Sequence, residues 1–186
     1  MSGLQEKAPR SGSDHVSFTE THRAQSASNS FGREHRTRSP ESGRLKSRHR
    51  LYCGVLGFDL MQRYGHDAAF LSAGGYHHHI ALNTWESKGG SPPGPRTTGL
   101  YHFAIRYPTR AALADALRRL IDAGISLEGA SDHGVSEALY LSDPDKNGIE
   151  LSWDRPKAEW PLTKDGHLRM DTRPLDTQEL LREPTS

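Results

Sequence analysis

Two histidines, a tyrosine and a glutamate in the second half of the chain lie in or beside strand-length apolar segments, where they could bind a metal ion. His102 lies in "LYHFAIRY", Tyr140 in "EALYLSD" and Glu150 in "IELSWD", and His133 lies in the turn before Tyr140. Two histidines and one carboxylate on neighbouring strands can form the facial triad that holds non-haem Fe(II) and leaves positions open for a substrate and dioxygen. The adjacent strands of this half supply only two of the three ligands, so the pattern allows a metal site that needs one more.

Each of these residues also has an ordinary structural reading. A histidine at a core edge is often only hydrogen-bonded, a tyrosine is common on half-buried strands, and His133 in a polar turn would usually be solvated. Glu150 is harder to explain in this way, because an apolar strand that buries a carboxylate must pair or coordinate it. The joint spacing of the four residues, rather than any one of them, favours a functional site.

Three adjacent histidines in "GGYHHHIALNTW", residues 74–85, form a second candidate group. If they lie in a strand, side-chain alternation puts His77 and His79 on one face and His78 on the other. The sequence does not say which face would line a cleft, so each of the three remains a candidate for acid/base chemistry.

The segments around these residues repeat one pattern. From about Leu51 the chain reads as the end of a helix that Gly57 terminates, followed by three strands, and a Gly/Pro-rich loop then leads to a second unit. In that unit a strand precedes a helix over 110–124, with Thr109 as its N-cap and Gly124 at its end, and three more strands follow. The apolar residues expected on one face of this helix are Leu113, Leu117, Leu120 and Ile121.

These units predict an α+β fold of two βαβββ modules, whose eight strands form a curved mixed sheet around a metal cleft. Residues 51–155 would form this domain, and residues 156–186 a C-terminal extension. The Ser/Arg-rich residues 1–50 would be largely disordered or would hold a degenerate first strand and helix.

Composition argues against several classes of protein. The 24 Lys and Arg residues nearly balance the 23 Asp and Glu residues, and the Ser/Arg-rich N-terminus lacks interleaved aromatic residues, so we expect no nucleic-acid partner. No apolar run is long enough to span a membrane or to form the core of a signal peptide, and the single Cys53 allows no intrachain disulfide. We therefore expect a soluble, cytoplasmic protein.

The stretch "SDHGVSEALYLSDPDKNGIE", residues 131–150, resembles the signature of extradiol ring-cleaving dioxygenases in the vicinal oxygen chelate superfamily, which also contains glyoxalases and bleomycin resistance proteins. "GGYHHHIALNTW" and "GLYHFAIRYPTRAALADALRRL" are similar to the catechol 2,3-dioxygenase-like branch of that superfamily. The resemblance extends roughly from Leu51 to Leu175. Two positions depart from the signature. One is Ser131, and the other is Lys146, where a Gly or Pro is usual.

Carried over residue by residue, the resemblance implies that His102 and Glu150 bind the metal and that Tyr140 donates a hydrogen bond to a substrate oxygen. His133 would contact the substrate or a metal ligand. His78 would be the acid/base residue, with His77 or His79 as alternatives. The tail after Trp153 is similar to that of the same branch, and we assign it no chemistry.

The third ligand of the superfamily is a histidine on the strand before the first helix. "DHVSF", residues 14–18, looks like this strand and nominates His15, although its spacing to "YCGVLGF" is longer than the family pattern. Three explanations compete: an insertion with His15 still a ligand, a substitute such as His35 or His49, or a degenerate N-terminus that leaves a two-ligand site.

The resemblance implies an extradiol dioxygenase that cleaves catechol-type aromatics with Fe(II), or Mn(II) in its place, and dioxygen, and that acts in the catabolism of aromatic compounds. Its partners would be a small aromatic diol and dioxygen, and a homo-oligomer is the default expectation for the superfamily. Two alternatives remain. One is a metal-dependent isomerase or transferase of the glyoxalase or fosfomycin-resistance kind, and the other is a catalytically impaired member that only binds its ligand.

Overall fold

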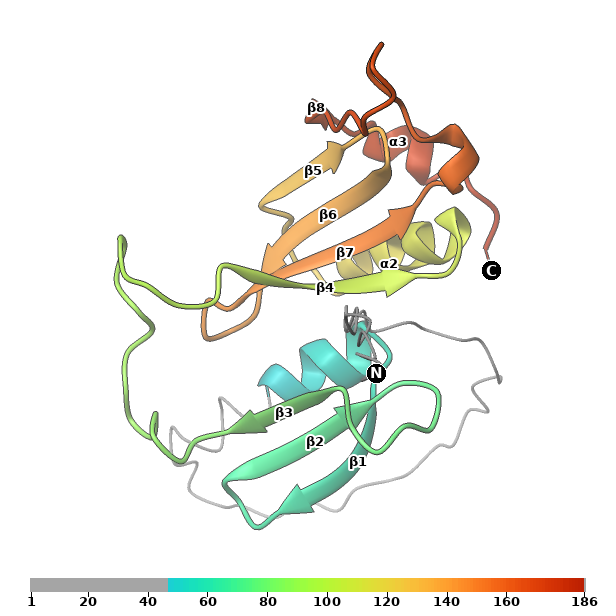
Figure 1. The fold of residues 1–186 in the computed structure, drawn as a ribbon. Helices are drawn as coiled ribbons and strands as arrows, with labels where there is room; N and C mark the ends of the chain where they lie inside the picture. The colour runs from blue at the N-terminus through green and yellow to red at the C-terminus, as the bar shows by residue number, and fades with distance from the viewer. Residues whose placement is uncertain (1–46, 186) are drawn as a thin grey trace, which may run out of the picture.

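A computed structural model describes residues 47–185 of the chain (Figure 1). The predictions for the first strand and for His15 and His35 lie outside these residues. The first half contains the short π-helix η1 (Arg50–Val55) and the strands β1 (Asp59–Tyr64), β2 (Ala68–Ser72) and β3 (Ile80–Asn83). The second half contains β4 (His102–Tyr107), α2 (Arg110–Asp122), β5 (Gly129–Asp132), β6 (Ser136–Ser142), β7 (Gly148–Asp154), the 3-10 turn η2 (Lys157–Glu159), β8 (Arg173–Pro174) and α3 (Thr177–Leu180).

The described strands form two sheets. The first has the antiparallel order β1-β2-β3, and the second has the order β4-β7-β6-β5-β8, in which only β4 and β7 pair in parallel. The α+β class is confirmed, and β4, α2 and β5–β7 reproduce the predicted βαβββ module. One continuous eight-stranded sheet is not present within residues 47–185: β3 and β4 do not pair, and the eighth strand is β8 from the C-terminal segment. The strand expected before the first helix would fall outside the described residues.

Helix α2 begins and ends where its sequence indicates. The Thr109 hydroxyl accepts a hydrogen bond from the backbone N–H of Ala112 at 3.1 Å, and Gly124, which follows the C-cap Ala123, adopts a positive φ of 68°. The predicted apolar face is correct for three residues and wrong for the fourth, since the side chain of Ile121 is 55% exposed. Ile121 lies in the last turn at the margin of the buried stripe, where the packed surface ends.

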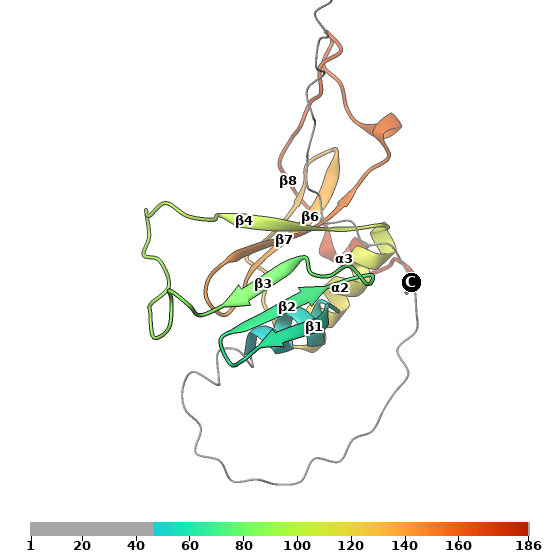
Figure 2. The same ribbon diagram turned by 60° about the horizontal axis from the view of Figure 1, so that its bottom comes forward.

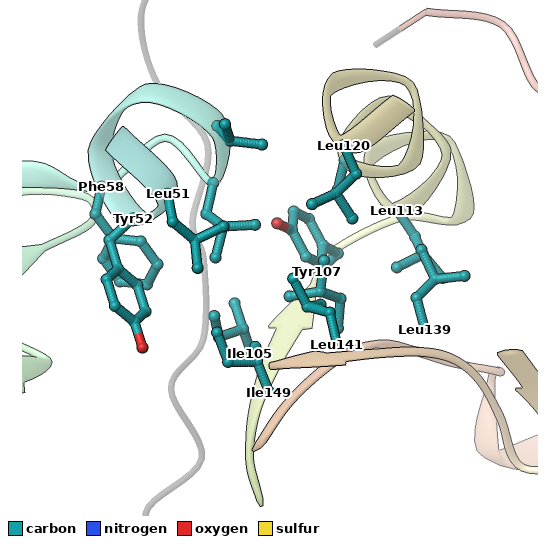
Figure 3. Packing of buried hydrophobic residues seen from close by; sticks show 14 of the residues in the cluster. Leu51, Tyr52, Phe58, Ile105, Tyr107, Leu113, Leu120, Leu139, Leu141 and Ile149 are labelled. Atoms are coloured by element: carbon teal, nitrogen blue, oxygen red, sulfur yellow. The ribbon is translucent and has the colours of Figure 1, made fainter. Parts of the chain in front are cut away.

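The core lies between the helices and one face of the second sheet, and it extends to Ala69 and Leu71 of β2 in the first sheet. Figure 3 shows side chains from η1 and α2 pointing toward side chains of β4, β6 and β7. On these strands every second residue is buried against the helices, because side chains alternate across a strand. The large apolar residues buried on this face are Ile105, Tyr107, Leu139, Leu141, Ile149 and Leu151. The opposite face of the sheet is therefore free to carry polar side chains.

The C-terminal segment is attached to this module at two points. Strand β8 pairs with β5, and Leu180 of α3 is fully buried in the core. The chain that connects β7 to β8, around residues 160–170, extends beyond the two sheets (Figure 2). Among residues 47–185, no helix has the length and apolar character needed to cross a membrane.

Candidate active site

Strand register brings His102, Tyr140 and Glu150 to the polar face of the second sheet. Glu150 on β7 is directly opposite Ala104 on β4 and Tyr140 on β6, and His102 lies two residues before Ala104, on the same face. The His102 Nε2 and Glu150 Oε2 atoms are 3.0 Å apart, and the Glu150 side chain is only 16% exposed. The two predicted ligands in the described part of the chain therefore converge.

Tyr140 connects this pair to His133. Its hydroxyl donates to Glu150 Oε1 over 3.3 Å, and it lies 2.9 Å from His133 Nε2. Burial, with the Glu150 carboxylate beside it, raises the pKa of Tyr140 to about 12. Tyr140 thus keeps its proton at neutral pH and can act as a hydrogen-bond donor.

Three of these residues, all but Glu150, line a cavity of about 650 Å³. His102, His133 and Tyr140 form part of its wall, and the Gly/Pro-rich loop before β4 forms another part. The wall also contains Ser131, Ser142, Lys146 and Thr172. A cavity of this size can hold a small organic ligand beside His102 and Tyr140.

Gly148 allows β4 and β7 to approach each other at the site. It pairs with His102, and a Cβ atom at position 148 would lie 2.0 Å from the Tyr101 carbonyl oxygen. The same Cβ would also lie 2.9 Å from the His102 Cβ. Only glycine fits there, because both obstructing atoms belong to β4 or to the residue before it. No role at the site was predicted for Gly148; its position two residues before Glu150 was the available signal.

The chain matches the family described as the Glyoxalase/Bleomycin resistance protein/Dioxygenase superfamily over residues 43–151, which is more than half of its length. The protein belongs to this superfamily. A glyoxalase/dioxygenase structure from Nostoc punctiforme, 17% identical, has the same fold, with a TM-score of 0.51 over 60% of this chain and 84% of that one.

Two relatives with assigned names extend the comparison. The chain is 44% identical over 133 residues to a catechol-2,3-dioxygenase of Bacillus subtilis (strain 168), a match that covers 71% of this chain and 45% of the relative. It is 36% identical over 117 residues to biphenyl-2,3-diol 1,2-dioxygenase 3 of Rhodococcus globerulus, covering 61% of this chain and 60% of that relative. The matched region therefore spans less than two thirds of either relative.

The triple-histidine segment of this superfamily member differs from the prediction. Residues 77–79 form a bend before β3, so the prediction that they alternate along a strand is wrong. In this bend His77 Nδ1 lies 2.7 Å from His78 Nδ1, and His79 Nδ1 lies 3.0 Å from the Ser72 hydroxyl. None of the three, and not His49, is among the residues that line the cavity beside His102.

The converging donor atoms of His102 and Glu150 are of the types that bind a divalent metal, but they are only part of a complete ligand set. An imidazole nitrogen from His102 and a carboxylate oxygen from Glu150 are two of the three donors of an Fe(II) facial triad. Within residues 47–185 no group of three His, Cys, Asp or Glu side chains could hold a metal ion. The third ligand predicted for the superfamily site, His15 or His35, lies outside these residues.

The turn that precedes Glu150 is held by a buried carboxylate. Asp143, 2% exposed, accepts hydrogen bonds from the backbone N–H groups of Asp145 and Asn147, and the Tyr52 hydroxyl donates to it over 3.1 Å. Lys146 within this turn has a φ of 70°, a left-handed conformation that favours glycine. Lys146 thus differs from the family signature at a position where glycine would adopt the observed backbone without strain.

Proposed function

We propose that this protein is an extradiol dioxygenase that opens catechol-type rings beside their vicinal hydroxyls, with Fe(II) and dioxygen. The observation that carries the proposal is the convergence of His102 and Glu150 next to the hydrogen-bonded pair Tyr140 and His133, three of which, His102, Tyr140 and His133, line one cavity. The names of the two dioxygenase relatives support the same reaction class and an aromatic diol as substrate.

In this proposal His102 Nε2 and Glu150 Oε2 hold the metal, with His15 as the third ligand and His35 as its substitute; His49, the other substitute considered, does not line the cavity beside His102. When bound, Fe(II) would favour deprotonation of a catechol hydroxyl and take part in electron transfer to dioxygen. Mn(II) accepts the same donor types and is the alternative ion. Loss of the third ligand would weaken metal binding severely.

Tyr140 and His133 would manage hydrogen bonds and protons at the substrate oxygens. Tyr140 holds its proton and can donate a hydrogen bond to the ring oxygen that becomes a carbonyl. His133 Nε2, 2.9 Å from the Tyr140 oxygen, can accept a proton and return it. The acid/base role of His78 rests on the resemblance, whereas His133 has the support of its place on the cavity wall.

The Tyr140–His133 pair also favours ring cleavage over the alternative reactions. An isomerase or transferase of the glyoxalase or fosfomycin-resistance kind has no evident need for this pair, and a protein that only binds ligand has no need for a proton carrier. We further infer a cytoplasmic homo-oligomer, since the lone Cys53 provides no intrachain disulfide and closed oligomers are common among such enzymes.

The decisive experiment loads the full chain with Fe(II) without oxygen, quantifies bound iron, then adds catechol and oxygenated buffer. We expect catechol-dependent oxygen uptake and a yellow ring-fission product. Glu150→Gln should lose its bound iron, and its rate should fall at least about 100-fold. Glu159→Gln, which changes an exposed carboxylate on η2, should behave as wild type. Stoichiometric iron without oxygen uptake on any catechol would favour the isomerase or transferase, and failure to retain iron would favour the binding protein.

A further inference from the structure

The C-terminal segment, for which the sequence indicates no chemistry, reaches the candidate site at Asp171. The backbone N–H of Asp171 donates to the His133 carbonyl oxygen over 3.1 Å, and the Asp171 carbonyl oxygen lies 3.0 Å from His133 Nδ1. Strand β8 begins two residues later and pairs with β5, directly before His133. Asp171 is therefore joined to both the backbone and the ring of His133.

The backbone around His133 is fixed from the other side as well. The Asp132 side chain accepts the Gly134 N–H at 2.7 Å, and Arg155 contacts the second Asp132 oxygen at 3.3 Å. The His133 N–H donates to the Ser136 carbonyl over 2.8 Å. With its backbone held in this way, the ring of His133 has a defined position between Asp171 and Tyr140.

The chemistry of a carbonyl oxygen decides where the ring proton lies. A carbonyl oxygen can only accept, so His133 Nδ1 must carry a hydrogen to bond Asp171. The Thr172 hydroxyl is a more distant neighbour of the same nitrogen, at 3.4 Å. In this tautomer Nε2 has no hydrogen and can only accept, so the Tyr140 hydroxyl donates to Nε2 at 2.9 Å and Glu150 Oε1 at 3.3 Å is its more distant acceptor. Nε2 is then the nitrogen left to exchange a proton.

We propose that Asp171 is a positioning residue, whose main-chain carbonyl fixes His133 as the Nδ1–H tautomer and directs Nε2 at the Tyr140 hydroxyl. The C-terminal segment is thus part of the catalytic apparatus. The catalytic consequence rests on the proposed dioxygenase function, whereas the tautomer is a property of the chain that can be measured without turnover.

The tautomer can be read by long-range proton–nitrogen NMR of the metal-free full chain, labelled at histidine nitrogen, at about pH 8, where an ordinary histidine is neutral. The His133 signal is assigned by its loss in His133→Asn. We expect a protonated Nδ1 and an unprotonated Nε2 in the wild type. Asp171→Ala keeps the backbone groups and should leave the signal unchanged, as should Thr172→Val.

Asp171→Pro tests the contact itself. Proline has no N–H, and its ring would push residue 171 away from the His133 carbonyl. We expect this variant to show a mixture of tautomers and, in the Fe(II)-loaded protein, a kcat about 10- to 100-fold lower with little change in KM. Asp165→Ala, at an exposed turn position of the same segment, should stay within about twofold of wild type, because Asp165 makes no contact with His133.

A wild-type His133 with its proton on Nε2 would overturn the inference. So would a tautomer that shifts in Thr172→Val but not in Asp171→Pro, because Thr172 would then be the acceptor. If Asp171→Pro does not fold, the wild-type and Thr172→Val spectra still decide the question. Correct spectra combined with a wild-type protein that consumes no oxygen with any catechol would refute the proposed function and leave the tautomer assignment in place.

Discussion

The two carboxylate oxygens of Glu150 have different partners: Oε2 lies 3.0 Å from His102 Nε2, and Oε1 accepts the Tyr140 hydroxyl over 3.3 Å. One side chain thus orients both a candidate metal ligand and a candidate hydrogen-bond donor. Because the two contacts use different atoms, substitution of Tyr140 should affect catalysis without removing the His102–Glu150 pair.

Tyr140→Phe is expected to retain Fe(II) and to lose roughly 100-fold in kcat, since it removes a hydrogen-bond donor that acts on the substrate oxygen. Bound iron and oxygen uptake measured on the same sample check this. Tyr64→Phe, a matched change at an exposed tyrosine of β1, should alter neither quantity. Loss of iron in Tyr140→Phe would mean that the hydroxyl supports metal binding instead.

Gly148→Ala is expected to destabilise the fold by roughly 1–3 kcal/mol and to weaken metal binding, because its Cβ would meet the Tyr101 backbone and force β4 away from β7. Urea unfolding and metal titration measure the two effects. The control is Gly94→Ala in the loop, where a Cβ would have no heavy atom within 4 Å. Equal stability of the two variants would contradict the close approach at Gly148.

Lys146→Gly is expected to stabilise the protein by up to about 1 kcal/mol. A left-handed non-glycine residue costs about 1–2 kcal/mol, which exceeds the backbone entropy that glycine loses on folding, about 0.5–1 kcal/mol. Lys164→Gly, at an exposed turn position without a positive φ, should instead be neutral or destabilising. Equilibrium unfolding in urea distinguishes the two, and a destabilised Lys146→Gly would count against strain at this turn.

The stability contribution of Asp132 should depend on pH. Burial acts to raise the pKa of Asp132, but the Gly134 N–H and the guanidinium groups of Arg155 and Arg173 outweigh it and hold that pKa below its ordinary value. A depressed folded-state pKa stabilises the protein above the ordinary aspartate pKa of about 3.9, and this stabilisation is lost as the pH falls through the folded pKa.

Asp132→Asn removes this contribution. Its free energy of unfolding should lie below that of the wild type by a constant amount near pH 7, and the difference should shrink once the pH falls below about 4. Urea unfolding at several pH values measures the difference. A gap that stays constant or widens on acidification would show that Asp132 does not gain stability from its charge.

Alternation along strands accounts for most of what the sequence predicted about the site. His102, Tyr140 and Glu150 lie in regular strands with buried neighbours at alternate positions, so their common face follows from periodicity. The same argument was wrong at His77, His78 and His79, because the strand begins only at Ile80. Apolar residues that follow a histidine run do not show where the extended backbone begins.

Two contributors to the site left little or no signal in the sequence. Gly148 matters through the absence of a side chain next to Tyr101, and a glycine beside a turn is usually explained by the turn alone. Asp171 contributes its main-chain carbonyl, which every residue possesses, so no residue type could indicate it. At Ile121 the signal in the sequence was wrong. The helical period was correct, but it did not predict where the packed surface of the helix ends.

The parallel pairing of β4 with β7 has a further consequence for how the site is assembled. These are the first and last strands of their module, and α2, β5 and β6 lie between them in the chain. His102 and Glu150 therefore meet only when the whole module has folded, and no local hairpin can bring them together. An ion bound by both residues would link the first strand of the module to its last. Metal affinity and the cooperativity with which the whole module folds should therefore rise and fall together.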